Sequence, residues 1–335
     1  MPRQPTRVLV LLCLLCLISG CALRADANPA TATGAPARPG GQVVITAMTY
    51  NILGGPVPDD WFPLIPRAEL IPTARAPGVV AKVRLADPDI IGFQEFAHRT
   101  PAGTYLEEQL RDYVWLHSAG EHALAFRANS FDLLGHGTEK LVSAGEQGSF
   151  LDRYADWARL RDRATGRVVL VVNVHQHPVQ TPVFARVRSV GIGRLVAAIE
   201  RLDPGLADPL VLLGDFNAGN AETRPVFADH LTGLAAAGFV DAGTVARADT
   251  SDVPRANSLH QLSAAVAGEP VAKVVRRNGR YIDYVWVPRG TTVLSWAVVS
   301  GPGVEWRQVH GKRVPVWTGV VPSDHSPVVA RLRYS

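Results

Sequence analysis

Polar side chains stand at the ends of several short apolar runs in the sequence, far apart along the chain. Glu95 closes one such run, and Asp215 closes another. In α/β folds, ligands bind where the loops at the carboxyl ends of strands converge, so residues distant in sequence can share one cleft. We therefore expect a common site for these residues. They are Asn51, Glu95, His175, Asp215 and Asn217.

This set of donors indicates chemistry with a hard cation and with phosphate oxygens. Near the C-terminal end, Asp324 and His325 add a carboxylate and an imidazole. Carboxylate, amide and water oxygens suit Mg²⁺, Mn²⁺ or Ca²⁺, and Mg²⁺ is our first choice. Zinc is less favoured, because the set holds no closely spaced group of three histidines or of two histidines and a carboxylate. The competing interpretation is that Asn51, Asp215 and Asn217 only form turns.

The first 20 residues have the form of a secretory signal peptide. Arg3 and Arg7 precede the apolar run 8–18, and Ser19 and Gly20 follow it. The run is well short of the roughly 20 residues that a membrane-spanning helix needs. We therefore expect the chain to be exported.

Cys21 follows a segment, 18–20, that resembles the lipobox of bacterial lipoproteins. The resemblance implies cleavage before Cys21, a diacylglyceryl group on its thiol and attachment to a membrane of the cell envelope, which two or more acyl chains make stable. The alternative is cleavage near Ala27, which leaves a soluble secreted protein. Residues 22–41 are rich in Ala, Thr, Pro and Gly, so we expect the segment 21–41 to be a lipidated cysteine with a flexible tether.

Composition excludes several classes of site. The cysteines are Cys13, Cys16 and Cys21, so a chain cut before Cys21 has no disulfide framework, cysteine metal site or cysteine nucleophile in its folded part. The formal net charge of +4 includes Arg3 and Arg7, which leaves the mature chain weakly basic. The sequence lacks the basic cluster expected of a tight duplex-DNA binder, and nucleic acid stays open as a substrate.

Residues 42–335 are expected to form one α/β domain, because no second low-complexity break and no repeat interrupts them. Short runs rich in β-branched residues predict strands, and helical patterns lie between several of them. The expected strands are 43–49, 89–93, 123–126, 167–174, 210–213, 281–287 and 328–332, and the expected helices are 68–85, 105–111 and 184–202.

Six short segments occur in the order seen in the endonuclease/exonuclease/phosphatase superfamily, which the chain resembles over nearly the whole domain. They are Thr49-Tyr50-Asn51-Ile52-Leu53, Gln94-Glu95, Asn173-Val174-His175, Gly214-Asp215-Phe216-Asn217, Ile282-Asp283-Tyr284 and Ser323-Asp324-His325. The resemblance implies a four-layer α/β sandwich, in which two packed β-sheets are flanked by helices. It also implies Mg-dependent hydrolysis of a phosphoester.

The same resemblance implies roles for individual residues. Glu95 is expected to be the principal metal ligand, with Asn51 and Asp324 beside it. His325 is expected to act as the general base that takes a proton from the attacking water, and Asp283 to hold its ring.

The resemblance leaves alternatives open for the general base, for the groups that bind phosphate and for the partner of Asp283. A rival assignment within the family gives the base role to Asp215. Asn217 is expected to orient the phosphate or the water, and His175 to donate to a phosphate oxygen or to the leaving group. Asp283 could instead pair with Arg280.

One region departs from the family pattern. In the nuclease branch an acidic residue supports the histidine that corresponds to His175, and Glu121 lies close to that place but is displaced from it in sequence. The abasic-endonuclease branch uses a tyrosine in this region, and this chain has no tyrosine at that place. Arg127 could reach phosphate instead. His177 is expected in a loop. The other histidines lie in no motif and are expected to be surface or packing residues: His98, His117, His122, His136, His230, His260 and His310.

The expected function is metal-dependent hydrolysis of a phosphoester, with a phosphodiester as the first choice. Nucleic acid, a phospholipid such as sphingomyelin and a phosphorylated small molecule such as an inositol phosphate are the candidate substrates. No protein partner is indicated. The alternative from another class is a surface-binding protein that has kept the fold and lost catalysis.

Overall fold

The computed structural model describes residues 41–55, 57, 66–118, 120–219, 229–253, 256–260, 281–309 and 311–335. The predicted signal peptide at 1–20, the predicted lipid site Cys21 and the tether up to residue 40 lie outside these residues. Among the helices of the described part, none is both long and apolar enough to cross a bilayer.

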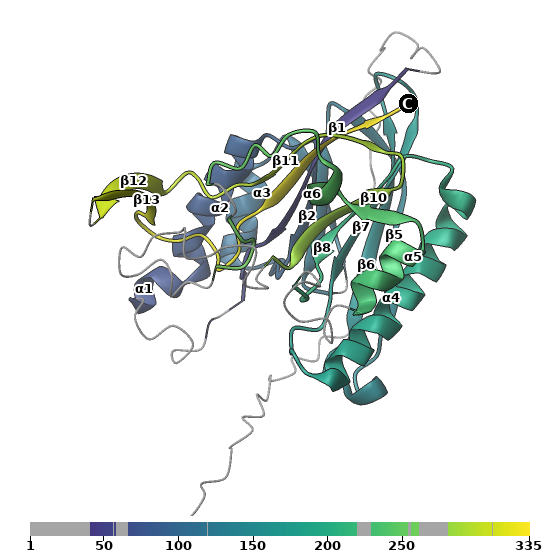
Figure 1. Cartoon of the computed structure of the whole chain (residues 1–335), viewed down its shortest axis with the longest axis horizontal. Coiled ribbons are helices and arrows are strands. Elements are labelled where there is room, and N and C mark those ends of the chain that lie inside the picture. Colours follow the sequence, from purple (N-terminus) through teal and green to yellow (C-terminus); the bar gives the residue numbers. More distant parts are fainter. Residues whose placement is uncertain are drawn as a thin grey trace, which may run out of the picture. The chain divides into compact units, whose positions relative to one another are not determined.

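The seven predicted strands are all present, and they divide between two six-stranded sheets (Figure 1). The first sheet has the order β11-β14-β1-β2-β4-β3. Its strands β1 and β2 run parallel, and its other neighbours are antiparallel. The bounds are β11 (Thr292–Val298), β14 (Val328–Tyr334), β1 (Val43–Asn51), β2 (Ile90–Gln94), β4 (His122–Arg127) and β3 (Tyr113–His117).

The second sheet has the order β5-β6-β7-β8-β10-β9, and it too has one parallel pair, β7 and β8. A separate hairpin joins β12 (Val304–Val309) to β13 (Lys312–Trp317). The bounds in the second sheet are β5 (Phe131–Val142), β6 (Arg153–Asp162), β7 (Val168–His175), β8 (Leu210–Asp215), β10 (Asp283–Pro288) and β9 (Phe239–Asp241).

Helices cover the outer faces of the two sheets, which confirms the predicted four-layer sandwich (Figure 1). Side chains alternate along β1, so Ile45 joins the core between the sheets while Met48 and Tyr50 pack outward against α2. Helix α4 lies over the second sheet, with Leu195 buried against it. The helices are α1 (Arg67–Leu70), α2 (Pro72–Ala86), α3 (Pro101–Gln109), α4 (Pro182–Leu202), α5 (Asp229–Ala236) and α6 (Ala242–Val245).

The helix predicted over 68–85 is two helices, because the chain is extended at Ile71 (φ −67°, ψ 129°). A residue that precedes proline disfavours the α conformation, and Pro72 then starts α2. The helix predicted over 105–111 begins earlier, at Pro101, where the Thr100 hydroxyl accepts a hydrogen bond from the Gly103 amide at 3.1 Å.

Seven strands escaped prediction from the sequence: β3, β5, β6, β9, β11, β12 and β13. The longest of them, β5, lies at an edge of its sheet and is largely solvent-facing along its middle. Its polar and glycine-rich sequence therefore lacks the apolar run that marks a buried strand. Its pairing with β6 is a property of the assembled sheet.

The two sheets approach each other closely where Gly92 of β2 faces Asn173 of β7. A Cβ atom at Gly92 would lie 2.6 Å from Asn173 Oδ1 and 3.0 Å from Leu213 Cβ. The Asn173 amide donates to the Phe93 carbonyl at 2.9 Å, and Gln94 Nε2 donates to Asn173 Oδ1 at 2.7 Å. These buried hydrogen bonds run from one sheet to the other and set their spacing just below the ends of β2 and β7.

The close approach predicts that Gly92→Ala lowers the free energy of unfolding by about 1–3 kcal/mol, the usual cost of overpacking a core. Gly193 is exposed on α4 with open space around it. The matched variant Gly193→Ala should therefore raise stability by about 0.4–1 kcal/mol. Urea unfolding of both variants measures the difference. Equal effects of the two substitutions would contradict the close contact.

Candidate active site

The register of the second sheet brings three site residues into one row. The parallel pair β7 and β8 places His175 opposite Asp215, and the antiparallel pair β8 and β10 places Asp283 opposite Asp215 on the other side. All three side chains are buried. Neighbouring strands alone therefore bring together two carboxylates and an imidazole that are distant in sequence.

Asn51 joins this row to the first sheet. It ends β1 opposite Gln94, so its side chain lies beside Glu95. Asn51 Nδ2 donates to Glu95 Oε1 at 2.9 Å and to Asp215 Oδ2 at 3.0 Å. A single amide thus bridges a carboxylate from each sheet.

The segment Ser323-Asp324-His325 closes the site from the C-terminal side. The Ser323 hydroxyl donates to the Asn51 carbonyl at 2.8 Å and accepts from the His325 amide at 3.1 Å, so it fixes the backbone of the segment. His325 Nδ1 lies 2.8 Å from Asp283 Oδ2. Its other ring nitrogen, Nε2, lies 3.9 Å from both Asp215 Oδ2 and Asp324 Oδ1. Arg280, the alternative partner of Asp283, lies outside the described residues.

Three site residues also make local turn contacts, as the competing interpretation expected. Asn51 Oδ1 accepts from the Leu53 amide at 3.0 Å, and Asp215 Oδ1 accepts from the Asn217 amide at 2.8 Å. The Asn217 side chain reaches beyond its turn, because its Nδ2 donates to the distant Gln176 carbonyl at 2.9 Å. These contacts coexist with convergence on one site, so they orient the same side chains that face it.

Two site residues hold a left-handed backbone, with φ of 53° at Glu95 and 49° at Asn217. Non-glycine residues adopt this conformation at a cost, and such residues cluster at functional sites. Here the conformation turns the chain sharply at the ends of β2 and β8.

Burial and neighbouring carboxylates raise the pKa of two acidic groups in this site. The pKa of Glu95 lies above its usual value, first because the group is buried and then because Asp324 repels its charge. The pKa of Asp215 is raised to about 7 by burial and by the charge of Asp283. Proton binding and cation binding at these groups are therefore both favourable.

The two imidazoles respond to the site in opposite directions. Burial alone would lower the pKa of His325, but the charges of Asp283 and Asp324 outweigh it and hold the pKa well above the usual value. Burial and the positive charge of Arg153 hold the pKa of His175 well below the usual value. His325 is thus favoured as the imidazolium and His175 as the neutral ring.

The donor set fits a divalent cation. Mutually repelling Glu95 and Asp324 lie on one side, and the carboxyl oxygens and ring nitrogen of Asp215, Asp283 and His325 all lie within 4.8 Å of one another. Asp283 Oδ1 is buried without a hydrogen-bond partner in the described part of the chain. Oxygen-rich clusters of this kind suit hard cations.

Residues 48–325 of the sequence match the family model described as Endonuclease/Exonuclease/phosphatase family. The chain belongs to the endonuclease/exonuclease/phosphatase family. Members of this family are hydrolytic phosphoesterases that generally use divalent metals, so membership supports that class of reaction here. The superfamily expected from the six motifs is thereby confirmed.

Solved structures of the family share the fold at low sequence identity. One endonuclease/exonuclease/phosphatase family protein from Bacteroides thetaiotaomicron has a TM-score of 0.66 at 21% identity, over 88% of this chain and 99% of that chain. The mannosyl-6-phosphatase of B. thetaiotaomicron VPI-5482 has a TM-score of 0.64 at 20% identity, over 87% and 100%. D. rerio TDP2 complexed with a single-strand DNA product has a TM-score of 0.56 at 15% identity, over 86% and 98%. A comparison with curated proteins gives no match.

Arg153 lies near the candidate active site, and it was not identified from the sequence. It begins β6 and is buried, and its Nε makes no hydrogen bond within the described residues. Burial lowers the pKa of its guanidinium, while the charges of Glu121, Asp215 and Glu95 favour the charged form. It stands in no motif, and only the pairing of β6 with β7 reveals its place.

His122 is buried, in agreement with the expectation of a surface or packing residue, and it lies beside His175. Its ring centroid is 6.0 Å from that of His175, and its Nδ1 is 3.2 Å from Asp156 Oδ2. This pair of His122 and Asp156 stands next to His175, where the family pattern led us to look for Glu121. Glu121 itself is exposed, and its charge faces Arg153.

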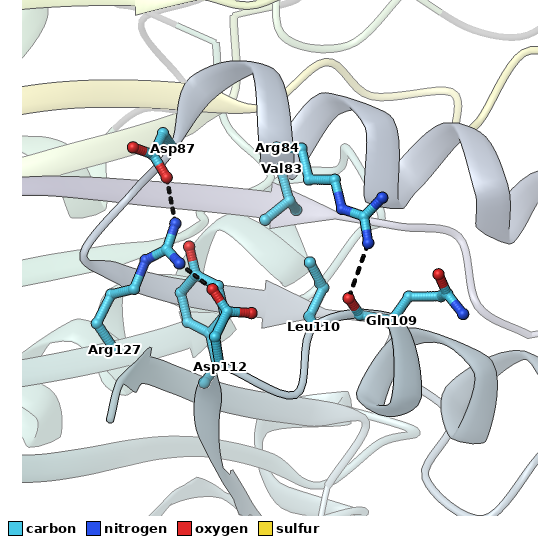
Figure 2. Close-up of a pocket in the computed structure, with 8 residues that line it drawn as sticks. Val83, Arg84, Asp87, Gln109, Leu110, Asp112 and Arg127 are labelled. Carbon is cyan, nitrogen blue, oxygen red and sulfur yellow. Dashed lines mark hydrogen bonds and ion pairs between the residues drawn. The ribbon is translucent and has the colours of Figure 1, made fainter. Parts of the chain in front are cut away.

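Arg127 does not reach the site, which corrects the expectation that it could contact phosphate. It pairs with Asp87 and Asp112 beside a surface cavity of about 340 Å³ (Figure 2). The antiparallel register of β4 and β2 puts Arg127 beyond Ile90, at the start of β2, whereas Glu95 follows its end. Arg127 therefore lies at the opposite end of the strands from Glu95.

His177 packs beside the site, in the loop after β7 as expected. Its ring stacks on Phe184 with centroids 4.0 Å apart and meets Phe150 edge-on. Burial and the charges of Arg153 and Arg188 lower its pKa to about 3. The ring is therefore neutral in the folded protein at neutral pH.

This lowered pKa predicts acid sensitivity that His177→Phe removes. Between pH 6.5 and about 3 the unfolded chain binds a proton at His177 that the folded chain does not, so stability falls as the pH falls. From pH 7 to pH 5 the wild type should lose about 2 kcal/mol more than the variant. Urea unfolding at both pH values measures this, with exposed His136→Gln as the control. Parallel pH dependence of wild type and His177→Phe would refute it.

Proposed function

We propose that the chain hydrolyses a phosphodiester with the help of a divalent cation, and that the pair of His325 and Asp283 activates the attacking water. The observation that carries the proposal is the 2.8 Å contact between His325 Nδ1 and Asp283 Oδ2. This contact leaves His325 Nε2 facing Asp215 and Asp324, next to the carboxylate and amide of Glu95 and Asn51.

Glu95, Asn51 and Asp324 would hold the cation, with Mg²⁺ as the first choice and Mn²⁺ or Ca²⁺ as alternatives. When bound, a divalent cation neutralises charge that grows on the phosphoryl oxygens and counters the carboxylates that raise the pKa of His325. The repulsion between the half-buried carboxylates of Glu95 and Asp324 supports this assignment.

His325 Nε2 accepts the proton of the water, and Asp283 holds the ring through Nδ1 and stabilises the imidazolium that forms. The rival base is Asp215, whose pKa of about 7 suits proton transfer at neutral pH. In either case the water oxygen attacks the phosphorus in line, and the P–O bond to the leaving group breaks on the opposite side. The leaving oxygen departs as an alcohol after it takes up a proton, and no covalent intermediate with the protein is needed.

Three further groups orient the phosphate. Arg153 supplies a buried positive charge whose Nε makes no hydrogen bond to the described residues, and this charge suits an anionic phosphate oxygen. His175, neutral because of its low pKa, donates a hydrogen bond to a phosphate oxygen or to the leaving group. Asn217 orients the phosphate or the water with its amide.

The substrate is proposed to be a nucleic acid, and the neighbour crystallised with a single-strand DNA product supports this choice. A phosphorylated sugar is the second candidate, which the mannosyl-6-phosphatase neighbour supports. A phospholipid or an inositol phosphate also contains the required phosphoester. A binding protein without catalysis would use the same fold but none of the proton chemistry.

Nicking of supercoiled plasmid by the mature chain in the presence of Mg²⁺ tests the function. EDTA should abolish nicking, and Glu95→Gln and His325→Ala should each lower the rate by at least about 10²-fold. Exposed His136→Ala should nick at the wild-type rate. The acid limb of the pH profile should persist in Asp215→Asn and vanish from the residual activity of His325→Ala.

Intact plasmid together with metal-dependent release of phosphate from mannose 6-phosphate would instead support a phosphorylated sugar as the substrate. Choline phosphate release from sphingomyelin would move it to phospholipid. Nucleic-acid binding that survives both EDTA and Glu95→Gln, without turnover of any of these compounds, would support the binding protein instead.

We further propose that the mature chain is held on the cell envelope by lipid on Cys21. The lipobox-like segment before Cys21 supports this, and a surface-held phosphoesterase would act on substrates met outside the cell. The alternative is a soluble secreted enzyme.

Detergent-phase partition of the full-length chain expressed in a bacterium tests the anchor. The wild type should enter the detergent phase and Cys21→Ala the aqueous phase, because only the thiol can carry the diacylglyceryl group. Phosphoesterase activity per molecule should be equal in the two. Aqueous partition of the wild type would show that the chain is not anchored in this way.

A further inference from the structure

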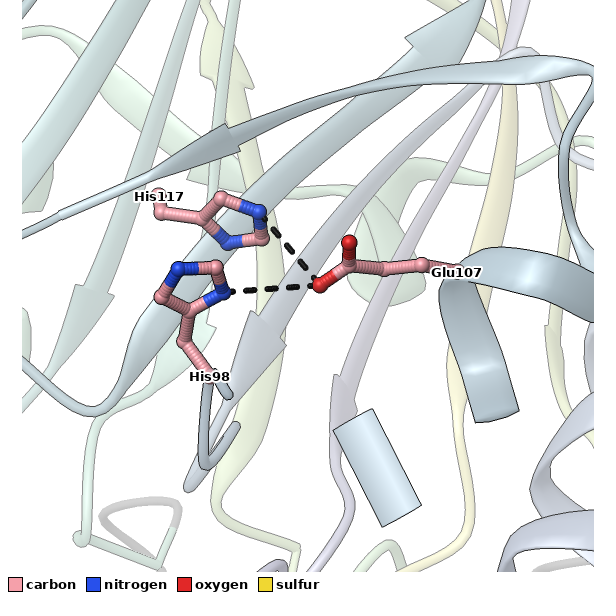
Figure 3. Close-up of side chains that lie close together, drawn as sticks. All are labelled: His98, Glu107 and His117. Carbon is pink, nitrogen blue, oxygen red and sulfur yellow. Dashed lines mark ion pairs between the residues drawn. The ribbon is translucent and has the colours of Figure 1, made fainter. Parts of the chain in front are cut away.

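A second cluster of metal-binding side chains lies outside the candidate active site. His98 stands in the loop after β2, Glu107 lies on α3, and His117 ends β3 (Figure 3). Figure 3 shows both imidazoles directed at one carboxylate. Spaced about ten residues apart, they form no sequence motif, and the two histidines were expected to be surface or packing residues.

The two distances from the carboxylate to the imidazoles match the edges of a zinc coordination sphere, and all three donor atoms lie within 4.8 Å of one another. Glu107 Oε1 lies 3.5 Å from His98 Nδ1 and 3.4 Å from His117 Nε2. Four ligands held tetrahedrally at about 2.0–2.2 Å from Zn²⁺ lie about 3.3–3.6 Å from one another. Direct hydrogen bonds between nitrogen and oxygen are shorter, at about 2.7–3.2 Å. The spacing therefore suits a shared cation better than direct hydrogen bonding.

The surroundings hold the donors in place and leave room for solvent. The His117 ring is stacked between Phe96 and His98, with centroid distances of 5.8 Å and 3.8 Å. His117 Nδ1 is buried without a partner in the described part of the chain, so Nε2 is the nitrogen open to an ion. The side chains of His98 and Glu107 are 38% and 31% exposed, which allows water to complete the coordination.

The charge state of the cluster also suits a cation. Burial, together with the neighbouring His98, holds the pKa of His117 below its usual value, so the ring offers a lone pair at neutral pH. Arg99 Nε donates to His98 Nε2 at 3.2 Å. Coordination through Nδ1 places the ring proton on Nε2, so this exposed hydrogen bond must open when an ion binds.

We propose that His98, Glu107 and His117 form a second metal site that takes Zn²⁺ or a similar transition-metal ion, with water as the remaining ligand. Two imidazoles and a carboxylate are a zinc ligand set, whereas the oxygen-rich catalytic cluster suits hard cations. The site would tie the loop that follows Glu95 to α3 and β3. Its occupancy would therefore stabilise the backbone next to the catalytic carboxylate.

Zinc stoichiometry of the mature chain tests the site. Protein stripped with EDTA is dialysed against Zn²⁺ and its metal content measured, for the wild type, His98→Ala/His117→Ala, Glu95→Gln and the control His136→Ala. The double variant should bind one ion fewer per chain than the wild type, and His136→Ala the same number. In the Glu95→Gln background, excess Zn²⁺ should raise the melting temperature by about 5 °C, and the double substitution should remove this rise.

Equal zinc content in the double variant and the wild type would overturn the proposal, as would an equal loss in His136→Ala. Equal melting temperatures of the stripped wild type and double variant establish that the double variant folds. If it is less stable, Glu107→Gln, which keeps the side-chain shape, serves in its place with the same two outcomes. Neither readout depends on turnover, so the result stands apart from the catalytic proposal.

Discussion

The contact between the two sheets at Gly92 and Asn173 is the constraint on which the catalytic geometry depends. The absence of a side chain on Gly92 lets the Asn173 amide cross from the second sheet to the Phe93 carbonyl of the first. Gln94 returns a hydrogen bond to Asn173 at 2.7 Å. Because these bonds lie one or two residues below Glu95 and His175, a change in sheet spacing would separate the groups that Asn51 bridges.

The bridge at Asn51 brings several carboxylates close together, and their negative charges repel one another. Glu95, Asp215, Asp283 and Asp324 come from four different segments, and burial raises the pKa of Glu95 and Asp215, which disfavours the charged forms of these two groups. Hydrogen bonds from Asn51 and the proximity of His325 offset part of that cost. A buried concentration of negative charge of this kind is stabilised by protons or cations, which links the fold of the site directly to its proposed chemistry.

The family fold does not specify the substrate, which depends on the residues around the site. Structures of similar fold include a mannosyl-6-phosphatase and a protein bound to single-strand DNA, at 20% and 15% identity to this chain. A fold shared at this level supplies the two sheets and their strand ends, while recognition is built from loop residues. Arg153 and His122, at the starts of β6 and β4, show how strands with no motif add groups around the shared centre.

The sequence by itself determined the family and the layered architecture through the resemblance of six ordered motifs. It also indicated candidate residues such as Glu95 and Asp215, because a short apolar run followed by a polar residue marks the carboxyl end of a buried strand. It did not determine the edge strands such as β5, whose alternating polar sequence is stabilised only by pairing with β6. The position of Arg127 was also not determined by the sequence. The antiparallel pairing of β4 with β2 places Arg127 near the start of β2 and away from Glu95, which follows its end. The cluster of His98, Glu107 and His117 depended entirely on tertiary structure, because only the fold brings donor atoms from a loop, from α3 and from β3 within 4.8 Å of one another.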